Sequence, residues 1–428
     1  MDPLHVGPAQ NRPAWQAALF GKDDALLAQL AESEPPGETH FEIATYINGL
    51  YRTTQHPFYQ GQDVRPDVER VLPAVHALRQ RLGWRQRELD IGLMRWIRRA
   101  SALSVVIGAG VTMAAGGPSW VELVRLLLEV ALEKGHEITQ MVPAPDSTPD
   151  HQTFERQVVG VERFKPEAEE EAKRILALIE AWQADTEALM RGAQLCYDLF
   201  GQHLFTHITG IIYSRAPQPG PIHRAIAELA HAQHVPDRGP GLFPGWDSII
   251  SYNFDDLMGE ALAEQQVPHA AWAMSGGELV GDPDELARKS DWHQPIFHLH
   301  GYTPRRLFLI TSVEFVFSTS QYFKVYGDKR SGIIDQALDQ YLANPVHVSL
   351  YVGCSFSDEA MNDLLREAAQ RYPGRFHFAL LRLPEELRGR EPTSDELETA
   401  SARYRDMGVQ PIWVHEYDEI PEMIRTLK

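Results

Sequence analysis

Two short stretches of the sequence carry residue types that could take part in catalysis. In SIISYNFDD, an apolar run is followed by Asn253 and Asp255. In PIFHLHGY, a second apolar run leads to His300, which stands directly before a glycine. An amide can position a water molecule, and an imidazole with a pKa near ~6.5 can accept a proton near neutral pH. These residue types therefore indicate a ligand site with acid–base capacity.

Two glycine turns follow apolar runs in the same way. Gly108 and Gly110 end the run in VVIGAGVTMAAGGPSW, residues 105–120, and Gly353 ends the run in LYVGCSFSD. Backbone N–H groups in such a turn, with a helix N-terminus behind it, can face an anion. The first turn fits neither the dinucleotide pattern G-x-G-x-x-G nor a phosphate-binding P-loop. Taken alone, it is equally consistent with a structural turn.

Each polar residue at these run ends also has a local explanation. Asp358 can cap the following helix, Asn253 can complete a turn, and His300 can be a structural histidine. Ligands of open α/β sheets bind outside the carboxyl ends of the strands. Four apolar runs in this chain are followed by such residues. Their number favours one shared site over four separate local roles.

Strand-like and helix-like segments alternate along the chain from Leu103 onwards. Alternation of this kind predicts βαβ units and a Rossmann-like α/β fold, in which a parallel sheet is flanked by helices. Continuous apolar runs are typical of strands buried on both faces of such a sheet. The predicted strands cover residues 103–108, 247–251, 295–300, 347–353, 376–383 and 411–415.

A long, mostly helical segment separates the first βα unit from the next predicted strand. Ser119 and Glu122 predict a capping box at the start of a helix. The proline-rich linker MVPAPDSTPD and several helical patterns follow, so we expect a helical insertion over about residues 141–215, within a domain spanning residues 99–428. Residues 1–98 predict a mostly helical N-terminal region, to which we assign an oligomerisation or partner surface.

Composition narrows the class of function. The formal net charge of −19 argues against sequence-independent binding of nucleic acid, which needs a basic surface. No run approaches the ~20 apolar residues of a membrane span, and the N-terminus lacks an export signal. Cys196 and Cys354 are the two cysteines and lie far apart. We therefore expect a cytoplasmic protein with no disulfide framework and no bound metal.

The motifs GAGVT, PSW, SYNFDD, HLHGY and VGCSFSD, in this order, resemble those of the sirtuin-like family. The likeness covers about residues 101–415, interrupted by the insertion, and is closest to the bacterial antiphage defence branch. That branch includes the sirtuin-like domain of Thoeris effectors and the sirtuin-like partner of HerA-type ATPases. The resemblance implies a Rossmann-like fold that binds NAD as a substrate and cleaves its nicotinamide–ribose bond.

The resemblance also implies roles for individual residues. Asn253 and His300 match the catalytic pair, and Asp255 matches the aspartate of the nicotinamide pocket. The remaining matches are all NAD-binding positions, on the phosphate turn, the cofactor loop and the adenosine-ribose turn. They are Gly108, Ala109, Gly110 and Thr112; Pro118, Ser119 and Trp120, where sirtuins carry a different stretch; and Gly353 and Ser355.

The resemblance implies an NAD+ hydrolase (NADase) that releases nicotinamide and ADP-ribose and depletes NAD+ during phage infection. Two alternatives stay open: a non-enzymatic NAD or ADP-ribose-binding regulatory subunit, and an NAD-dependent protein deacylase. Sirtuin deacylases carry a zinc module with paired cysteines, and the corresponding interval here holds Cys196 alone. Hydrolysis by water is therefore favoured over deacylation. We expect a homo-oligomer gated by a partner, with a HerA-type hexameric ATPase as the leading candidate.

Overall fold

A computed structural model gives the fold of most of the chain. It describes residues 102–143, 154–233, 246–275, 278–289, 293–305, 315–326, 347–371, 377–390 and 392–427. The predicted N-terminal helical region, residues 1–98, lies outside the described residues.

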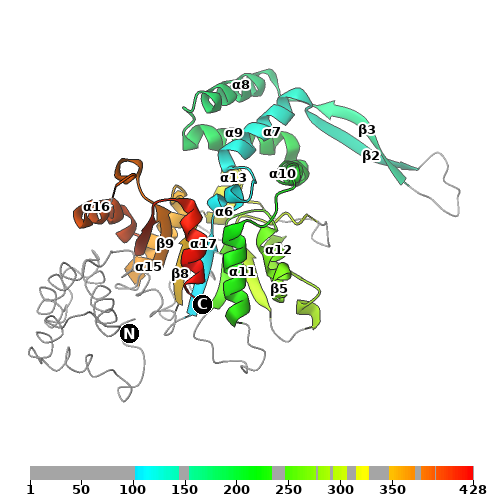
Figure 1. The fold of residues 1–428 in the computed structure, drawn as a ribbon. Helices are drawn as coiled ribbons and strands as arrows, with labels where there is room; N and C mark the ends of the chain where they lie inside the picture. The colour runs from blue at the N-terminus through cyan, green and yellow to red at the C-terminus, as the bar shows by residue number, and fades with distance from the viewer. Residues whose placement is uncertain are drawn as a thin grey trace, which may run out of the picture.

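An eight-stranded sheet forms the centre of the described chain (Figure 1). Its strand order is β10-β9-β8-β1-β4-β7-β5-β6, and every neighbouring pair is parallel except β5 and β6. The strands are β1 (Ala102–Ile107), β4 (Trp246–Ser251), β5 (His269–Ser275), β6 (Glu278–Pro283), β7 (Gln294–His298), β8 (His347–Val352), β9 (His377–Arg382) and β10 (Val409–Val414). The predicted Rossmann-like fold is confirmed.

Strands β5 and β6 extend one side of the sheet and were not predicted from the sequence. β5 has the sequence HAAWAMS and β6 the sequence ELVGDP. β6 forms the edge of the sheet and pairs antiparallel with β5, so it does not need the continuous apolar run of a central parallel strand.

Helices cover both faces of the sheet, and each face has its own apolar core. One core contains side chains of α11, α12 and α17, and the other contains side chains of α13 and α15. The helices around the sheet are α6 (Ala109–Ala114), α11 (Pro221–Gln233), α12 (Leu257–Glu264), α13 (Thr319–Tyr326), α15 (Glu359–Arg371), α16 (Ser394–Arg405) and α17 (Ile420–Arg425), with short 3-10 turns at Ala287–Lys289, Glu385–Leu387 and Tyr417–Glu419. Among the described residues, no helix is long and apolar enough to cross a membrane.

Four helices form a separate bundle between β1 and β4, and a two-stranded hairpin extends from it (Figure 1). A third apolar core holds the bundle together. The elements are α7 (Trp120–Glu133), β2 (His136–Pro143), β3 (Phe154–Glu162), α8 (Pro166–Glu180), α9 (Thr186–Phe200), a 3-10 turn at Gly201–His203, and α10 (Leu204–Tyr213). The helices follow the predicted pattern, whereas the hairpin replaces part of the expected linker.

The position of β1 explains where a site can form. β1 pairs with β4 on one side and with β8 on the other, so the chain leaves the central strand in both directions. The strand order reverses at this point, and loops after neighbouring strands separate there. The carboxyl ends of β1, β4, β7 and β8 therefore bring four distant segments to one edge.

Candidate functional site

The two glycine turns pack directly against each other. The amide of Gly108 donates to the carbonyl of Val352 at 3.0 Å, and the amide of Gly110 donates to the carbonyl of Gly353 at 2.9 Å. Gly353 has a φ of +67°, and a Cβ atom added at Gly110 would lie 2.9 Å from its Cα atom. Glycine is required here because the two backbones touch. Ala109 and Ser355 form an exposed rim above this contact.

Asn253 joins the end of β4 to the first glycine turn. Its side-chain Nδ2 donates to the carbonyl of Gly108 at 2.9 Å, across 145 positions of sequence. Its own backbone N–H donates to the hydroxyl of Ser251 at 3.1 Å, so the turn expected after β4 is also present. The local turn expected for Asn253 is therefore present, and this buried residue also contacts the first glycine turn.

Asp255 lies buried beneath the same turn. Its Oδ2 accepts a hydrogen bond from the Thr112 hydroxyl at 2.5 Å, and its Oδ1 accepts one from the backbone N–H of Leu257 at 3.1 Å. Burial raises the pKa of Asp255, and the bonds from Thr112 and Leu257 oppose that rise. This carboxyl group is therefore held in one orientation by α6 and by the start of α12.

His300 follows β7 and is held by three aromatic or acidic neighbours. Its Nε2 lies 2.9 Å from the hydroxyl of Tyr326 and 3.8 Å from Oδ2 of Asp358, and its ring meets Tyr252 edge-on with centroids 4.8 Å apart. Burial lowers the pKa of His300, and Asp358 opposes that effect. The imidazole therefore tends towards its neutral form, which can accept a proton.

The ends of β4 and β7 are tied to each other as well as to β1. The Nδ1 atom of His298 lies 3.0 Å from the carbonyl of Asn253. The N–H of Tyr252 donates to the carbonyl of Ile107 at 3.0 Å, while the ring of Tyr252 contacts His300. The predicted catalytic residues and the glycine turns therefore share one edge of the sheet.

Pro118, Ser119 and Trp120 lie at the start of α7, where the bundle begins. The Ser119 hydroxyl accepts a hydrogen bond from the N–H of Glu122 at 3.1 Å, as expected of an N-cap. The Glu122 carboxylate pairs with Arg215 at 2.6 Å, and Trp120 packs against the core of the bundle. The role of these three positions in NAD binding stays a prediction.

Three tyrosines near the site were not predicted from the sequence. Tyr326 contacts His300, Tyr322 donates a hydrogen bond to Asp358, and Tyr213 accepts one from the backbone N–H of Asp256 at 2.9 Å. Tyr322 and Tyr326 are four positions apart, a spacing that places both on one face of α13. This spacing in the sequence indicates that the two tyrosines share a helix face, but it does not indicate which residues they contact.

Asp358 caps the following helix, as one of its two expected roles requires, and also lies close to His300. Its Oδ1 accepts a hydrogen bond from the N–H of Met361 at 3.1 Å at the start of α15, and its Oδ2 faces His300.

Among the described residues, no group of three or more His, Cys, Asp or Glu side chains could hold a metal ion. Burial raises the pKa of the Cys354 thiol to about 12, so this cysteine beside Gly353 stays protonated and is a poor nucleophile.

Comparison with known families agrees with this geometry. Residues 247–412 match the sequence model of the SIR2-like domain. The matched segment contains Asn253, Asp255, His300 and the β8 turn. No curated protein matches the chain.

The match supports a sirtuin-like domain, a class whose members are NAD-dependent enzymes. NAD-related chemistry is thus the function class that fold and family together indicate.

Proposed function

We propose that the chain hydrolyses NAD+ at the nicotinamide–ribose bond and releases nicotinamide and ADP-ribose. The observation that carries the proposal is the hydrogen bond from Asn253 to Gly108, together with the bond from Thr112 to Asp255 and the contact of Tyr252 with His300. These contacts hold an amide, a carboxyl group and an imidazole at the edge of the sheet where the first glycine turn lies. Groups preorganised in a buried setting supply the largest part of many enzymatic accelerations.

Each residue has a distinct role in the proposed reaction. Nicotinamide leaves NAD+ as a neutral molecule, so the positive charge that develops on the ribose and the incoming water are what need help. His300, held neutral by burial, accepts a proton from that water or from a ribose hydroxyl. Asp255 has two oxygens with lone pairs beyond those used by Thr112 and Leu257, and these accept the carboxamide N–H of nicotinamide.

The phosphates of NAD+ meet the outer rim of the glycine turns. The amides of Gly108 and Gly110 are bonded to the β8 turn, and the Thr112 hydroxyl is bonded to Asp255. The amide of Ala109, in the first turn of α6, remains as a donor, and the exposed hydroxyls of Ser355 and Ser357, which share a hydrogen bond of 2.6 Å, lie at the second turn. NAD+ therefore fits across the contact between the two turns, with its nicotinamide end towards Asn253.

Water is the proposed acceptor because the chain lacks the paired cysteines of the deacylase zinc module. Resemblance to the antiphage branch adds the proposed cellular role, which is depletion of NAD+ during infection. Such an activity would kill an uninfected host, so we propose gating by self-assembly or by a HerA-type hexameric ATPase.

The test is chromatography of NAD+ incubated with the chain, alone and with a HerA-type ATPase. We expect nicotinamide release by the wild type, and a loss of about 100-fold or more in Asn253→Ala and in His300→Ala. His231→Ala is the matched control because His231 is an exposed histidine on α11, away from the site. Thermal unfolding of each variant separates lost chemistry from lost structure.

Calorimetric titration with NAD+ distinguishes hydrolysis from the alternative of a binding module. Binding without cleavage in every condition would replace the hydrolase with the regulatory subunit. Neither binding nor cleavage, or equal cleavage by His300→Ala and His231→Ala, would contradict the proposal.

A further inference from the structure

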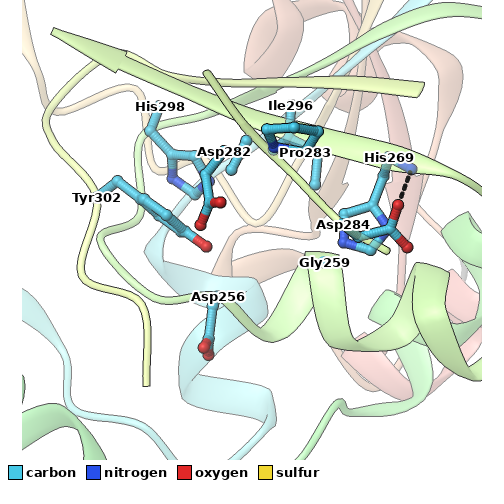
Figure 2. Close-up of a pocket in the computed structure, with 10 residues that line it drawn as sticks. Asp256, Gly259, His269, Asp282, Pro283, Asp284, Ile296, His298 and Tyr302 are labelled. Atoms are coloured by element: carbon cyan, nitrogen blue, oxygen red, sulfur yellow. Dashed lines mark hydrogen bonds and ion pairs between the residues drawn. The ribbon is translucent and has the colours of Figure 1, made fainter. Parts of the chain in front are cut away.

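A polar cavity lies beside the proposed NAD+ site, at the half of the sheet that contains β5, β6 and β7. It has a volume of about 90 Å³, is partly open to solvent and is lined by residues of β5, β6, β7 and the start of α12 (Figure 2). Its lining includes Asp256 but none of Asn253, Asp255 or His300. The cavity is therefore a neighbour of the catalytic turn and not a part of it.

Three carboxyl groups line this cavity, and its described lining includes no lysine or arginine. Asp284 is occupied, since its Oδ1 accepts the N–H of Ala287 at 2.6 Å. Asp256 is held by Tyr213 and by the backbone N–H of Arg305. Asp282 forms an ion pair with Arg288 at 3.8 Å, and the Arg288 side chain is 54% exposed.

Asp282 thus contributes a carboxylate with spare accepting capacity. Burial raises the pKa of Asp282 and of Asp256, as it does for carboxyl groups that lack enough cationic partners.

Two deeply buried side chains point polar atoms into the same space without a partner. Tyr302 is 7% exposed, and its hydroxyl has no hydrogen-bond partner among the described residues. His298 is 2% exposed and uses Nδ1 towards Asn253, while its Nε2 has no partner in the described part of the chain. Figure 2 shows the Tyr302 hydroxyl and the Asp282 carboxylate directed towards the same part of the cavity. These atoms are open to the cavity and can bond a ligand held there, because the Tyr302 hydroxyl can donate or accept and Nε2 of a neutral His298 can accept.

We propose that this cavity binds a small guanidinium compound. A guanidinium group offers planar, fork-shaped donors that match a carboxylate, and its charge suits a lining with three carboxyl groups. The rings of Tyr302 and His298 pack on each other with centroids 4.4 Å apart, so a cation can stack only on an outer face of this pair. One water needs roughly 10–15 Å³ of such volume, so the cavity has room for a group of a few heavy atoms.

Binding at this cavity would reach the catalytic turn through one residue. His298 lines the cavity and also contacts the Asn253 carbonyl at 3.0 Å. The Asn253 carbonyl keeps the proton on Nδ1, so Nε2 of the neutral ring is an acceptor, and a ligand that donates to Nε2 would hold the ring and that contact in place. Regulation of NAD+ cleavage by the compound rests on the proposed function, whereas its binding does not.

The binding test uses methylguanidinium and its uncharged isostere N-methylurea, titrated into the full chain by calorimetry without NAD+. We expect saturable binding of methylguanidinium and at least about tenfold weaker binding of N-methylurea. Asp282→Asn should weaken methylguanidinium by about tenfold, and Tyr302→Phe by roughly threefold. Glu285→Gln is the matched control, since the side chain of Glu285 is 82% exposed just outside the cavity.

Three results would overturn the site. The first is no saturable binding of methylguanidinium, which would mean that the cavity holds only water. The second is equal binding of methylguanidinium and N-methylurea. The third is equal binding of methylguanidinium by the wild type and by Asp282→Asn. Thermal unfolding of Asp282→Asn and Tyr302→Phe checks that each variant is folded. NAD+ is absent from the titration, so failure of this site and failure of the proposed hydrolase are separate results.

Discussion

The edge of the sheet and the helical bundle use polar side chains in opposite ways. At the sheet edge, Asn253 and Asp255 are buried, and their partners lie more than 140 positions away in sequence. In the bundle, Arg174 pairs with Glu171 three positions earlier, and 58% of the Arg174 side chain is exposed. Contacts of the first kind bind distant segments into one site. Contacts of the second kind lie on the surface of helices whose formation does not depend on them.

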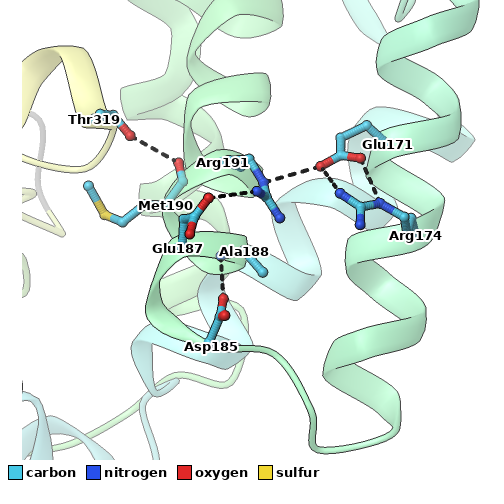
Figure 3. Close-up of polar contacts among 8 residues, drawn as sticks. All are labelled: Glu171, Arg174, Asp185, Glu187, Ala188, Met190, Arg191 and Thr319. Carbon is cyan, nitrogen blue, oxygen red and sulfur yellow. Dashed lines mark hydrogen bonds and ion pairs between the residues drawn. The ribbon is translucent and has the colours of Figure 1, made fainter.

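The bundle is held by its apolar core, and its polar groups run over the surface. Leu127 and Leu128 of α7 pack with Ile175 of α8 and Ala193 of α9. Figure 3 shows the polar layer above this core, in which Arg191 reaches across from α9 to α8. Buried apolar area stabilises by about 25 cal/mol per Å², whereas an exposed ion pair adds about 0–1 kcal/mol. Polar substitutions should therefore be costly at the sheet edge and mild in the bundle.

The largest effect is expected from Gly353→Ala. A Cβ atom at this position would lie 2.6 Å from the backbone nitrogen of Val111, and φ is +67°. The strained backbone costs about 1–2 kcal/mol and the steric overlap about 1–3 kcal/mol, so we expect a loss of roughly 3 kcal/mol in urea unfolding. Gly389→Ala is the matched control, because Gly389 has a φ of +79° and open space around it.

Gly389→Ala should lose only the backbone part of that cost, about 1 kcal/mol. Equal losses in the two variants would mean that the contact between the glycine turns does not constrain the sheet edge.

The second effect is a pH dependence that comes from the buried imidazole of His298. Burial lowers the pKa of His298 to about 4 in the folded chain, whereas the unfolded chain keeps a value near ~6.5. Between these values the unfolded chain binds more protons, so the free energy of unfolding falls as the pH decreases. The full window corresponds to about 3 kcal/mol.

Unfolding of the wild type and of His298→Gln between pH 7 and pH 4 measures that contribution. The variant should lose less stability over the window than the wild type does. Parallel curves would show that this imidazole is not held neutral by the fold.

Candidate site residues could be recognised in the sequence where a glycine or a polar residue directly follows an apolar run. Strands β1, β4, β7 and β8 are apolar runs, and Gly108, Asn253, His300 and Gly353 stand out because they follow such runs. The topology then requires them to meet, because the carboxyl ends of neighbouring parallel strands share one edge. The fold class and the meeting of these residues at one edge of the sheet could therefore be predicted from the sequence, whereas their role in binding NAD stays a prediction.

The partners of these residues were not accessible in the same way. Tyr326 reaches His300 because α13 docks on α9, where Ser320 donates its backbone N–H to Gln194 at 3.0 Å. Such a contact depends on how two helices 126 positions apart pack, and no local spacing encodes it. The same holds for Tyr213, which comes from the bundle and reaches Asp256.

A third, smaller effect is expected where the two regions meet. The hydroxyl of Tyr213 accepts the N–H of Asp256 and lies 2.8 Å from the Asp256 carboxylate. Tyr213→Phe leaves both groups short of a partner, so we expect a loss of about 2 kcal/mol in unfolding free energy. Tyr417→Phe is the matched control, since Tyr417 is exposed and should change by less than about 0.5 kcal/mol.

If the catalytic turn depends on this contact, kcat for NAD+ cleavage should also fall in Tyr213→Phe while KM changes little. Equal stabilities of the Tyr213 and Tyr417 variants would mean that the bundle does not support the turn.

The smallest effect is expected for Arg191→Gln, although Arg191 makes the most visible polar bridge of the bundle. Its guanidinium lies 3.3 Å from Glu171 and 2.9 Å from Glu187, but 43% of the side chain is exposed. Water and salt compete with such pairs, so we expect a change of about 0.5 kcal/mol that shrinks further at 1 M salt. A salt-independent loss above about 1.5 kcal/mol would show that Arg191 acts as a buried structural contact. The bundle would then resemble the sheet edge, and the contrast between the two regions would no longer predict where substitutions are costly.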